Sequence, residues 1–549
     1  MPQRKVLPVL LAVVLAIAMT WPLVLHLGSE AQLVDDWGDP LYLTWQVAWI
    51  GHALLHAPLH ILQSNFYWPI ENNLTFTDVL FGYAPAGLVG SQGPHAALVV
   101  HNVIFIFTFV LAFLGAFLLA RELGAGAWGG AAAGAAFAYA PWKLAQAGHL
   151  HVLSSGGIPL ALYLLVRGYR RSHSRLIVAG WLVAAWQMTL GFNLGLQFAY
   201  LLLVLGAVVI ARWIVQGRPR LGSTALRASA LGIAVFVIVT ALVAAPYVHV
   251  QRTYPEAKMK TAEVAFFSPP PRAFLTAPSY SLVWGAATGH RRTTLRSNVE
   301  QTLFPGVTTL LFALFGLLST AYSLRLRIGL AAGTLASFAL SLGLPSADHP
   351  DQGFTPFRFL YDFAPGWDGV RTPGRLNNLT SLGLALLAAA GVALAIRWVG
   401  RFTYRSASAV VPAAVVAAIL VEGFGPMPHV RVPARPPAEL AAPAPQLHLP
   451  MIVGLDGIYA YWAIGPYPRM ANAASSFEPQ VVAVVRAAAK VFPDASSVQF
   501  LRHIGVRSVI VHRDLAVDTP WQNVSERSIA GLGITRRNEG ELVIYDLGG

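Results

Sequence analysis

The sequence contains no cysteine, and it is poor in charged residues. Only 11% of its 549 residues are Asp, Glu, Lys or Arg, whereas a soluble globular domain carries about 25%. The absence of cysteine excludes disulfides and thiolate metal sites. Apolar side chains replace the missing charge and make up 55% of the chain. This composition predicts a polytopic membrane protein.

Basic residues outnumber acidic ones, and the formal net charge is +13. They are scattered through the loops and form no block, which argues against a nucleic acid partner. Scattered Lys and Arg are instead typical of the charges that orient membrane helices. We therefore interpret the positive charge first as a signal of topology.

A membrane-spanning helix needs about 20 apolar residues, and eleven stretches approach that length. The first follows a short basic N-terminus and is longer than the apolar region of a signal peptide, so we expect an uncleaved anchor, with a signal peptide as the less favoured alternative. Gly and Ala in 126–138 indicate close helix packing. The predicted spans are 6–27, 97–120, 126–141, 154–169, 175–191, 194–214, 226–248, 303–323, 327–344, 377–397 and 407–421.

Arginines fall in alternate short connections, which predicts an N-terminus inside. Among the short connections on the other side, 142–153 holds only Lys143, and 192–193 holds no basic residue. This orientation places four long segments outside the membrane. They are 28–96, 249–302, 346–376 and everything after about 422.

The chain divides into a transmembrane domain, 1–421, and a tail that changes character. Residues 422–450 are rich in Pro and Ala and read as a linker. Residues 451–549 predict a small α/β domain outside the membrane, because helical and alternating patterns both occur in it. The expected helices are 478–491 and 494–504, and the expected strands are 506–512 and 541–547.

Three carboxylates, Asp35, Asp36 and Asp39, lie directly after the first span. Residues 40–57 have apolar positions at helical spacing, which predicts an amphipathic helix in the membrane interface with Asp39 as its cap. A carboxylate beside another in a partly desolvated place gains basicity and suits removal of a hydroxyl proton. A cation site and a solvated turn are the alternatives.

Several longer stretches resemble the GT-C superfamily of polytopic glycosyltransferases, and more closely a group of largely uncharacterised bacterial members. The resemblance covers about 30–380. It rests on Gly38-Asp39-Pro40-Leu41 with Trp45 and Trp49, Asn65-Phe66-Tyr67-Trp68-Pro69, His149-Leu150-His151 before Pro159-Leu160, Glu300-Gln301-Thr302-Leu303-Phe304-Pro305-Gly306, and Pro365-Gly366-Trp367-Asp368-Gly369-Val370-Arg371-Thr372-Pro373-Gly374-Arg375.

The resemblance implies a GT-C-like α-helical membrane protein with about 11 spans, the N-terminus inside and the C-terminus outside. It also implies a glycosyltransferase of the inner membrane that moves a sugar from a polyprenyl-phosphate donor to a glycan, lipid or protein acceptor on the outer face. The catalytic acid of the superfamily lies in the first outside loop, which points to Asp39 and then Asp36. Here the acidic pair is Asp35-Asp36 before Trp37, with Asp39 offset, so the choice of base stays open.

Other polar residues in the outside segments are candidates for substrate contacts. Arg371 and Arg375 suit a lipid phosphate, because a guanidinium binds two of its oxygens; a topological anchor or a pair with Asp368 is the alternative. His149 and His151 suit interfacial hydrogen bonds or a substrate contact more than a metal. Glu300 is either an ion-pair partner of Arg296 or a substrate contact. Asn65, Tyr67 and Asp35 complete the set of substrate-binding candidates.

No phosphate-binding loop or dinucleotide fingerprint occurs, so a nucleotide-sugar donor and a nucleotide cofactor are not expected. No metal ligand set is assigned, and a divalent cation at the aspartates is the less favoured alternative. Two other functions are compatible with the chain: a lipid or small-molecule transporter, and a non-catalytic GT-C-like protein of envelope assembly. Ion-coupled transport calls for charges inside the spans, and these are almost lacking.

Overall fold

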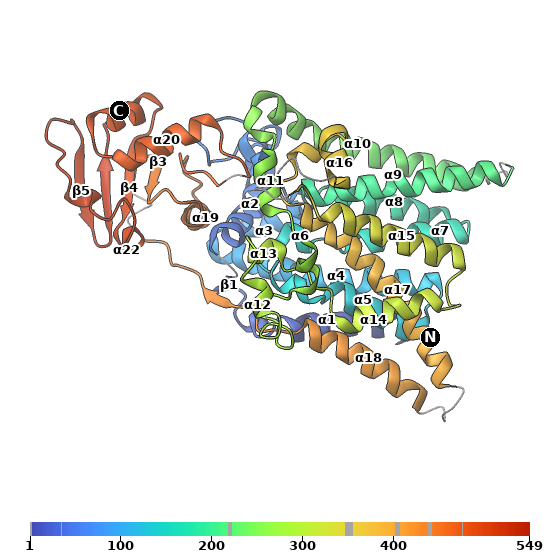
Figure 1. Ribbon diagram of the computed structural model, residues 1–549. Coiled ribbons are helices and arrows are strands. Elements are labelled where there is room, and N and C mark those ends of the chain that lie inside the picture. Colours follow the sequence, from blue (N-terminus) through green and yellow to red (C-terminus); the bar gives the residue numbers. More distant parts are fainter. Residues whose placement is uncertain are drawn as a thin grey trace. The chain divides into compact units, whose positions relative to one another are not determined.

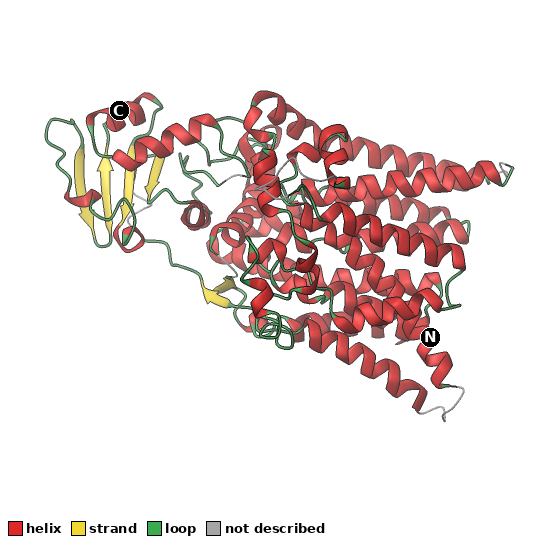
Figure 2. Cartoon of the chain, viewed as in Figure 1, coloured by secondary structure: helices red, strands yellow, loops and turns green. Residues whose placement is uncertain are grey.

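The computed structural model describes residues 3–33, 36–217, 222–345, 355–400, 407–436, 442–474 and 476–548. Most of these residues are helical, and a small sheet forms near the C-terminus (Figures 1 and 2). The chain divides into two compact units. The first comprises 1–25, 104–245 and 258–428, and the second comprises 26–103, 246–257 and 429–549.

The long helices of the first unit run roughly parallel or antiparallel to one another (Figure 1). Helices α4 and α10 continue into the second unit. The helices are α1 (Gln3–Met19), α4 (Pro94–Leu123), α5 (Gly126–Ala138), α6 (Leu150–Leu153), α7 (Gly157–Arg170), α8 (Ser174–Met188), α9 (Phe192–Val215), α10 (Ser223–Thr253), α11 (Thr261–Phe267), α12 (Gly289–Arg292), α13 (Asn298–Gln301), α14 (Val307–Leu318), α15 (Leu324–Ser341), α16 (Pro356–Phe363), α17 (Asn377–Val399) and α18 (Ala407–Gly423).

Helix α17 is the centre of this packing, with α5, α14, α15 and α18 around it. Small residues permit the close approach. A Cβ added to Gly129 of α5 would lie 2.7 Å from the Ala389 carbonyl oxygen, and one added to Gly391 would lie 2.0 Å from the Phe312 carbonyl oxygen. The close packing predicted from Gly and Ala in 126–138 is confirmed.

Each of the eleven predicted spans coincides with a helix. Five described helical segments are long and apolar enough to cross a membrane: 94–123, 150–170, 192–215, 223–253 and 373–399. The protein is a membrane protein; its number of spans and its orientation stay predictions.

Two boundaries differ from the expected ones for a local reason. Helix α1 ends at Met19 and not at 27, because Pro22 lacks the amide that a continuing helix needs. Helix α14 begins at Val307 and not at 303, after Gly306 at φ +95°. There the carboxylate of Glu422 from α18 accepts hydrogen bonds from the Thr308 amide.

The second unit combines residues 28–96, called the first outside segment after their predicted side, with the tail. Strand β1 (Glu30–Gln32) pairs antiparallel with β2 (His429–Arg431). The four-stranded sheet has the order β3-β4-β6-β5, in which only β3 and β4 are parallel. The other elements are α2 (Gly38–His56), α3 (Ala84–Gly90), α19 (Val453–Trp462), α20 (Gln480–Val491), α21 (Ala495–His503), α22 (Arg513–Ala516), β3 (Gln446–Leu449), β4 (Ser508–His512), β5 (Thr535–Glu539) and β6 (Leu542–Asp546).

The predicted helices and strands of the tail are confirmed as α20, α21, β4 and β6. The segment 422–450 is not only a linker, because it contains the strands β2 and β3. All four residues of β3 are buried, and they pair with β4. Residues 437–441 of this segment lie outside the described part of the chain.

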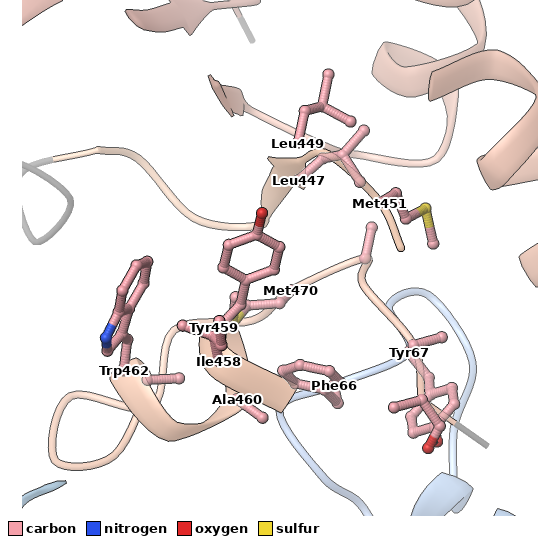
Figure 3. Packing of buried hydrophobic residues seen from close by; sticks show 14 of the residues in the cluster. Phe66, Tyr67, Leu447, Leu449, Met451, Ile458, Tyr459, Ala460, Trp462 and Met470 are labelled. Carbon is pink, nitrogen blue, oxygen red and sulfur yellow. The ribbon is translucent and has the colours of Figure 1, made fainter. Parts of the chain in front are cut away.

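One hydrophobic core joins the first outside segment to the tail. Phe66 and Tyr67 are each 1% exposed and belong to the same cluster as Leu447, Tyr459 and Trp462. Figure 3 shows these side chains around α19 and β3. The first outside segment is therefore part of the unit that also contains the tail sheet.

Candidate functional site

The acidic stretch lies at the start of α2. Helix α2 begins at Gly38 with Trp37 as its N-cap, and Asp39 is in its first turn. The expected role of Asp39 as cap is wrong: the Gly38 amide instead donates to Asp36 Oδ1 at 2.7 Å. Both Asp36 and Asp39 are exposed, and Asp35 lies outside the described residues. A carboxylate in the first helical turn is favoured by the helix dipole.

Helix α2 is more buried than expected for an amphipathic helix that lies in the membrane interface. Thirteen of its nineteen residues are buried, and it packs on α3 and α19. At its start the approach to α19 is close, because a Cβ on Gly454 would lie 2.9 Å from Asp36 Oδ2. Packing against α19 thus restrains the backbone that carries the two aspartates.

Asn65 and Tyr67, expected to contact a sugar, lie inside the protein. Asn65 accepts from the Trp45 indole at 3.0 Å and donates to the Pro468 carbonyl at 2.8 Å. The Tyr67 hydroxyl donates to the Ala474 carbonyl. These contacts give both residues a structural role, since they are 4% and 1% exposed.

A second polar cluster lies within the first unit, around Glu300 and Arg375. Arg375 Nη2 donates to Glu300 Oε1 at 2.6 Å, and Nε donates to Oε2 at 3.3 Å. The two side chains are 8% and 11% exposed. The Ser297 hydroxyl accepts from the Glu300 amide and holds α13 in place. The result is a buried, bidentate ion pair.

The two predicted histidines belong to this cluster. Arg375 Nη1 lies 2.9 Å from His151 Nε2. Because a guanidinium can only donate, Nε2 of His151 accepts, and the ring is neutral with its proton on Nδ1. His149 Nδ1 lies 2.8 Å from Gln146 Oε1 and 3.9 Å from Glu300 Oε1. The sequence prediction that these histidines serve hydrogen bonds fits this geometry.

Burial by itself would raise the pKa of Glu300. Arg375, His149 and Arg371 outweigh burial and hold that pKa below its usual value. The carboxylate therefore stays ionised near neutral pH, which makes it a poor general base.

Arg371 is the more accessible of the two arginines assigned to the lipid phosphate. It is 36% exposed and lies 3.7 Å from Glu263, with its guanidinium 5.0 Å from the centre of the Phe267 ring. Asp368, the alternative partner, lies 3.8 Å from Lys258. Each side of the Arg375 guanidinium already meets Glu300 or His151, so Arg371 is better placed to meet a ligand.

Sequence reasoning missed Lys143 and Gln146. The Lys143 side chain is 3% exposed, donates to the Ser155 hydroxyl at 3.2 Å and lies 4.7 Å from the Phe137 ring centre. Burial lowers the pKa of Lys143 to about 7. Gln146 donates to the Val299 carbonyl at 2.7 Å and so ties the histidine segment to α13. The sequence signal that could have identified Lys143 is its position as the only Lys or Arg in the short, largely apolar connection 142–153.

Among the described residues, no group of three or more His, Asp or Glu side chains could hold a metal ion. Asp35 lies outside that search. The cation alternative for the aspartates, which includes Asp35, stays a prediction.

No family model matches the chain. No curated protein matches it in sequence either. Solved structures do match. The arabinofuranosyltransferase AftD from Mycobacteria aligns with a TM-score of 0.56 and 16% identity, over 100% of this chain and 40% of that one. The apo oligosaccharyltransferase of Archaeoglobus fulgidus aligns with a TM-score of 0.52 and 13% identity, over 93% of this chain and 70% of that one.

Both of these structures belong to the GT-C superfamily. The chain therefore has a GT-C-like fold, as the resemblance in its motifs predicts. It spans about two fifths of the length of the mycobacterial arabinofuranosyltransferase.

Proposed function

We propose that the protein is a glycosyltransferase that moves a sugar from a polyprenyl-phosphate donor to an acceptor hydroxyl on the outer face of the cytoplasmic membrane. The observation that carries the proposal is the GT-C-like fold over the whole chain, with two exposed aspartates at the start of α2. The two structural neighbours are named as glycosyl-transferring enzymes.

Asp39 is the first candidate for the base, and Asp36 is the second. The base would take the proton of the acceptor hydroxyl while its oxygen attacks the anomeric carbon. The bond from that carbon to the phosphate oxygen breaks, and polyprenyl phosphate leaves with the electron pair. We assign Asp39 first because the resemblance to the superfamily points to it before Asp36.

A cation would stabilise the charge that builds on the leaving phosphate. Arg371 suits this role, because its side chain is partly exposed and its ion pair with Glu263 is long at 3.7 Å. Arg375 would then orient the site through Glu300 and His151 and not grip the phosphate itself.

The test is release of polyprenyl phosphate by the purified full chain in detergent. A panel of polyprenyl-phosphate sugars serves as donors, and an extract of envelope glycans supplies acceptors. We expect Asp39→Asn to lower release about 10²- to 10⁴-fold, the usual contribution of a general base. Asp518→Asn, an exposed aspartate of the tail, is the matched control and should release at the wild-type rate.

Equal release by wild type, Asp36→Asn and Asp39→Asn would exclude the aspartate mechanism. A collapse in Asp36→Asn alone would transfer the role of base to Asp36. No release with any donor and acceptor would favour the non-catalytic GT-C-like alternative.

A further inference from the structure

A cavity of about 750 Å³ lies within the second unit, away from the start of α2. One wall comes from the first outside segment and the others from the tail. Its lining residues are Trp68, Ala444, Pro445, Arg469, Arg502, Gly505, Val506, Arg507 and Gly548. A volume of this size is in the range of sites for small organic ligands.

The described lining residues include three arginines and no Asp or Glu. Arg469, Arg502 and Arg507 are exposed, and none of them forms an ion pair with another described residue. Arg502 donates to the carbonyl oxygens of Leu547 and Gly533 at 2.5 and 2.6 Å. Carbonyls hold the guanidinium in place without cancelling its charge. Three arginines around one cavity, none paired with a carboxylate of the described residues, attract an anion.

Trp68 supplies a fixed aromatic wall. Its indole donates to the Ile504 carbonyl at 2.7 Å, and its amide donates to the Met470 carbonyl at 2.9 Å. A Cβ on Gly505 would lie 3.7 Å from the ring, so the ring lies against the backbone there. The Arg469 guanidinium lies 5.0 Å from the ring centre. A flat ring beside these arginines suits a ligand with both a ring and an anionic group.

We propose that this cavity binds an anionic glycan, with a sugar ring against Trp68 and a phosphate or carboxylate group held by Arg469 and Arg507. A single phosphate would fill only a small part of the volume. This site is additional to the proposed transfer reaction, because its residues include neither Asp36 nor Asp39.

The test is calorimetric binding to the purified full chain in detergent at low salt. The probes are maltotetraose, a maltotetraose phosphate, tetragalacturonate, inorganic phosphate and uridine monophosphate. We expect one or both of the anionic tetrasaccharides to bind at least tenfold more tightly than maltotetraose. Comparing the phosphorylated with the carboxylated tetrasaccharide shows whether the site prefers a phosphate or a carboxylate. Arg507→Gln should weaken that binding about tenfold, which corresponds to about 1.4 kcal/mol.

Arg507→Lys keeps the charge and should bind more tightly than Arg507→Gln, which separates a binding role from loss of folding. Arg537→Gln on β5, where Arg537 pairs with Glu539, is the control and should bind as wild type. Asp39→Asn should also bind as wild type, so failure of the transfer proposal leaves this result intact. Equal binding of neutral and anionic tetrasaccharides, tighter binding of phosphate or uridine monophosphate, or no binding would overturn the proposal.

Discussion

Glu300 and Arg375 are 75 positions apart in the chain, yet they form a buried, bidentate ion pair. Sequence reasoning selected both as separate substrate contacts. Their bidentate geometry and their low exposure instead make each the partner of the other. At the scale of single residues, these contacts pair the two side chains with each other and leave Arg371 the more accessible of the two arginines predicted to bind the phosphate.

Removing one member of this pair leaves the other charge buried without compensation. We expect Glu300→Gln to lower the stability by about 3–5 kcal/mol. The double variant Glu300→Gln/Arg375→Gln should recover part of that loss, because no charge remains buried. Thermal unfolding in detergent measures both. Arg371→Gln, which removes a more exposed charge, is the control. Stability of Glu300→Gln equal to that of wild type or of this control would contradict the pairing.

Asp456 of α19 is a buried carboxyl with an unusual pKa. It accepts from the Asn472 amide at 2.8 Å and lies 3.9 Å from Arg486. Burial outweighs both contacts and raises the pKa of Asp456 to about 7. The folded state therefore keeps the proton when the unfolded state has lost it.

Because its pKa is raised in the folded state, Asp456 stabilises the fold at low pH, and this stability is lost as the pH rises through about 7. Relative to Asp456→Asn, we expect the wild type to lose about 1.5 kcal/mol of stability between pH 5.5 and pH 7, and little more above pH 8. The pKa values of buried His448 and His512 are lowered; both proteins share this contribution, so it cancels in the comparison. If the free energies of unfolding of the two proteins changed in parallel with pH, the raised pKa of Asp456 would be refuted.

At the scale of elements, the contact of α2 with α3 depends on two glycines. A Cβ on Gly51 would lie 2.0 Å from the backbone carbonyl group of Gly87, and one on Gly87 would lie 2.2 Å from the Val47 carbonyl oxygen. No side chain fits between the two helix backbones at this point. The same helix carries Asp39, so its placement matters for the proposed base.

We expect Gly87→Ala to cost about 1–3 kcal/mol, because the two helices must separate to admit the methyl group. Gly206→Ala in α9 is the control: no neighbouring atom lies within 4 Å of the added Cβ, and Ala favours the helix. The control should be as stable as wild type or more stable. Thermal unfolding of the two variants measures this difference. Equal stability of Gly87→Ala and Gly206→Ala would contradict the close contact of α2 with α3.

Strand β3 shows why some elements escaped prediction. It has only four residues, and it lies in a segment whose Pro and Ala content indicates a linker. Its partner β4 is more than 55 residues further along the chain. Burial of Leu447 and Leu449 against β4 makes the strand stable, and no local pattern reports that pairing. Helices α20 and α21 were predictable because their apolar periodicity is local.

At the scale of the whole molecule, the helices and the GT-C-like fold are established, and the orientation is a prediction from arginine placement. The absence of cysteine permits a direct test with single introduced cysteines. We expect Asp518→Cys to react with a membrane-impermeant maleimide in intact cells, and His173→Cys to react only after the membrane is permeabilised. Both positions are exposed. The reverse pattern would invert the topology.

The sequence by itself determined the apolar helices, the close packing of α5, the helices and two strands of the tail, and the GT-C-like class. These features follow from composition, periodicity and short motifs, which act over a few helical turns. Only the tertiary structure decided that the first outside segment shares a core with the tail, that Asn65 and Tyr67 are buried, and that Arg375 is paired with Glu300. Such contacts join residues far apart in the chain, and their burial and hydrogen bonding depend on neighbours that no local pattern specifies.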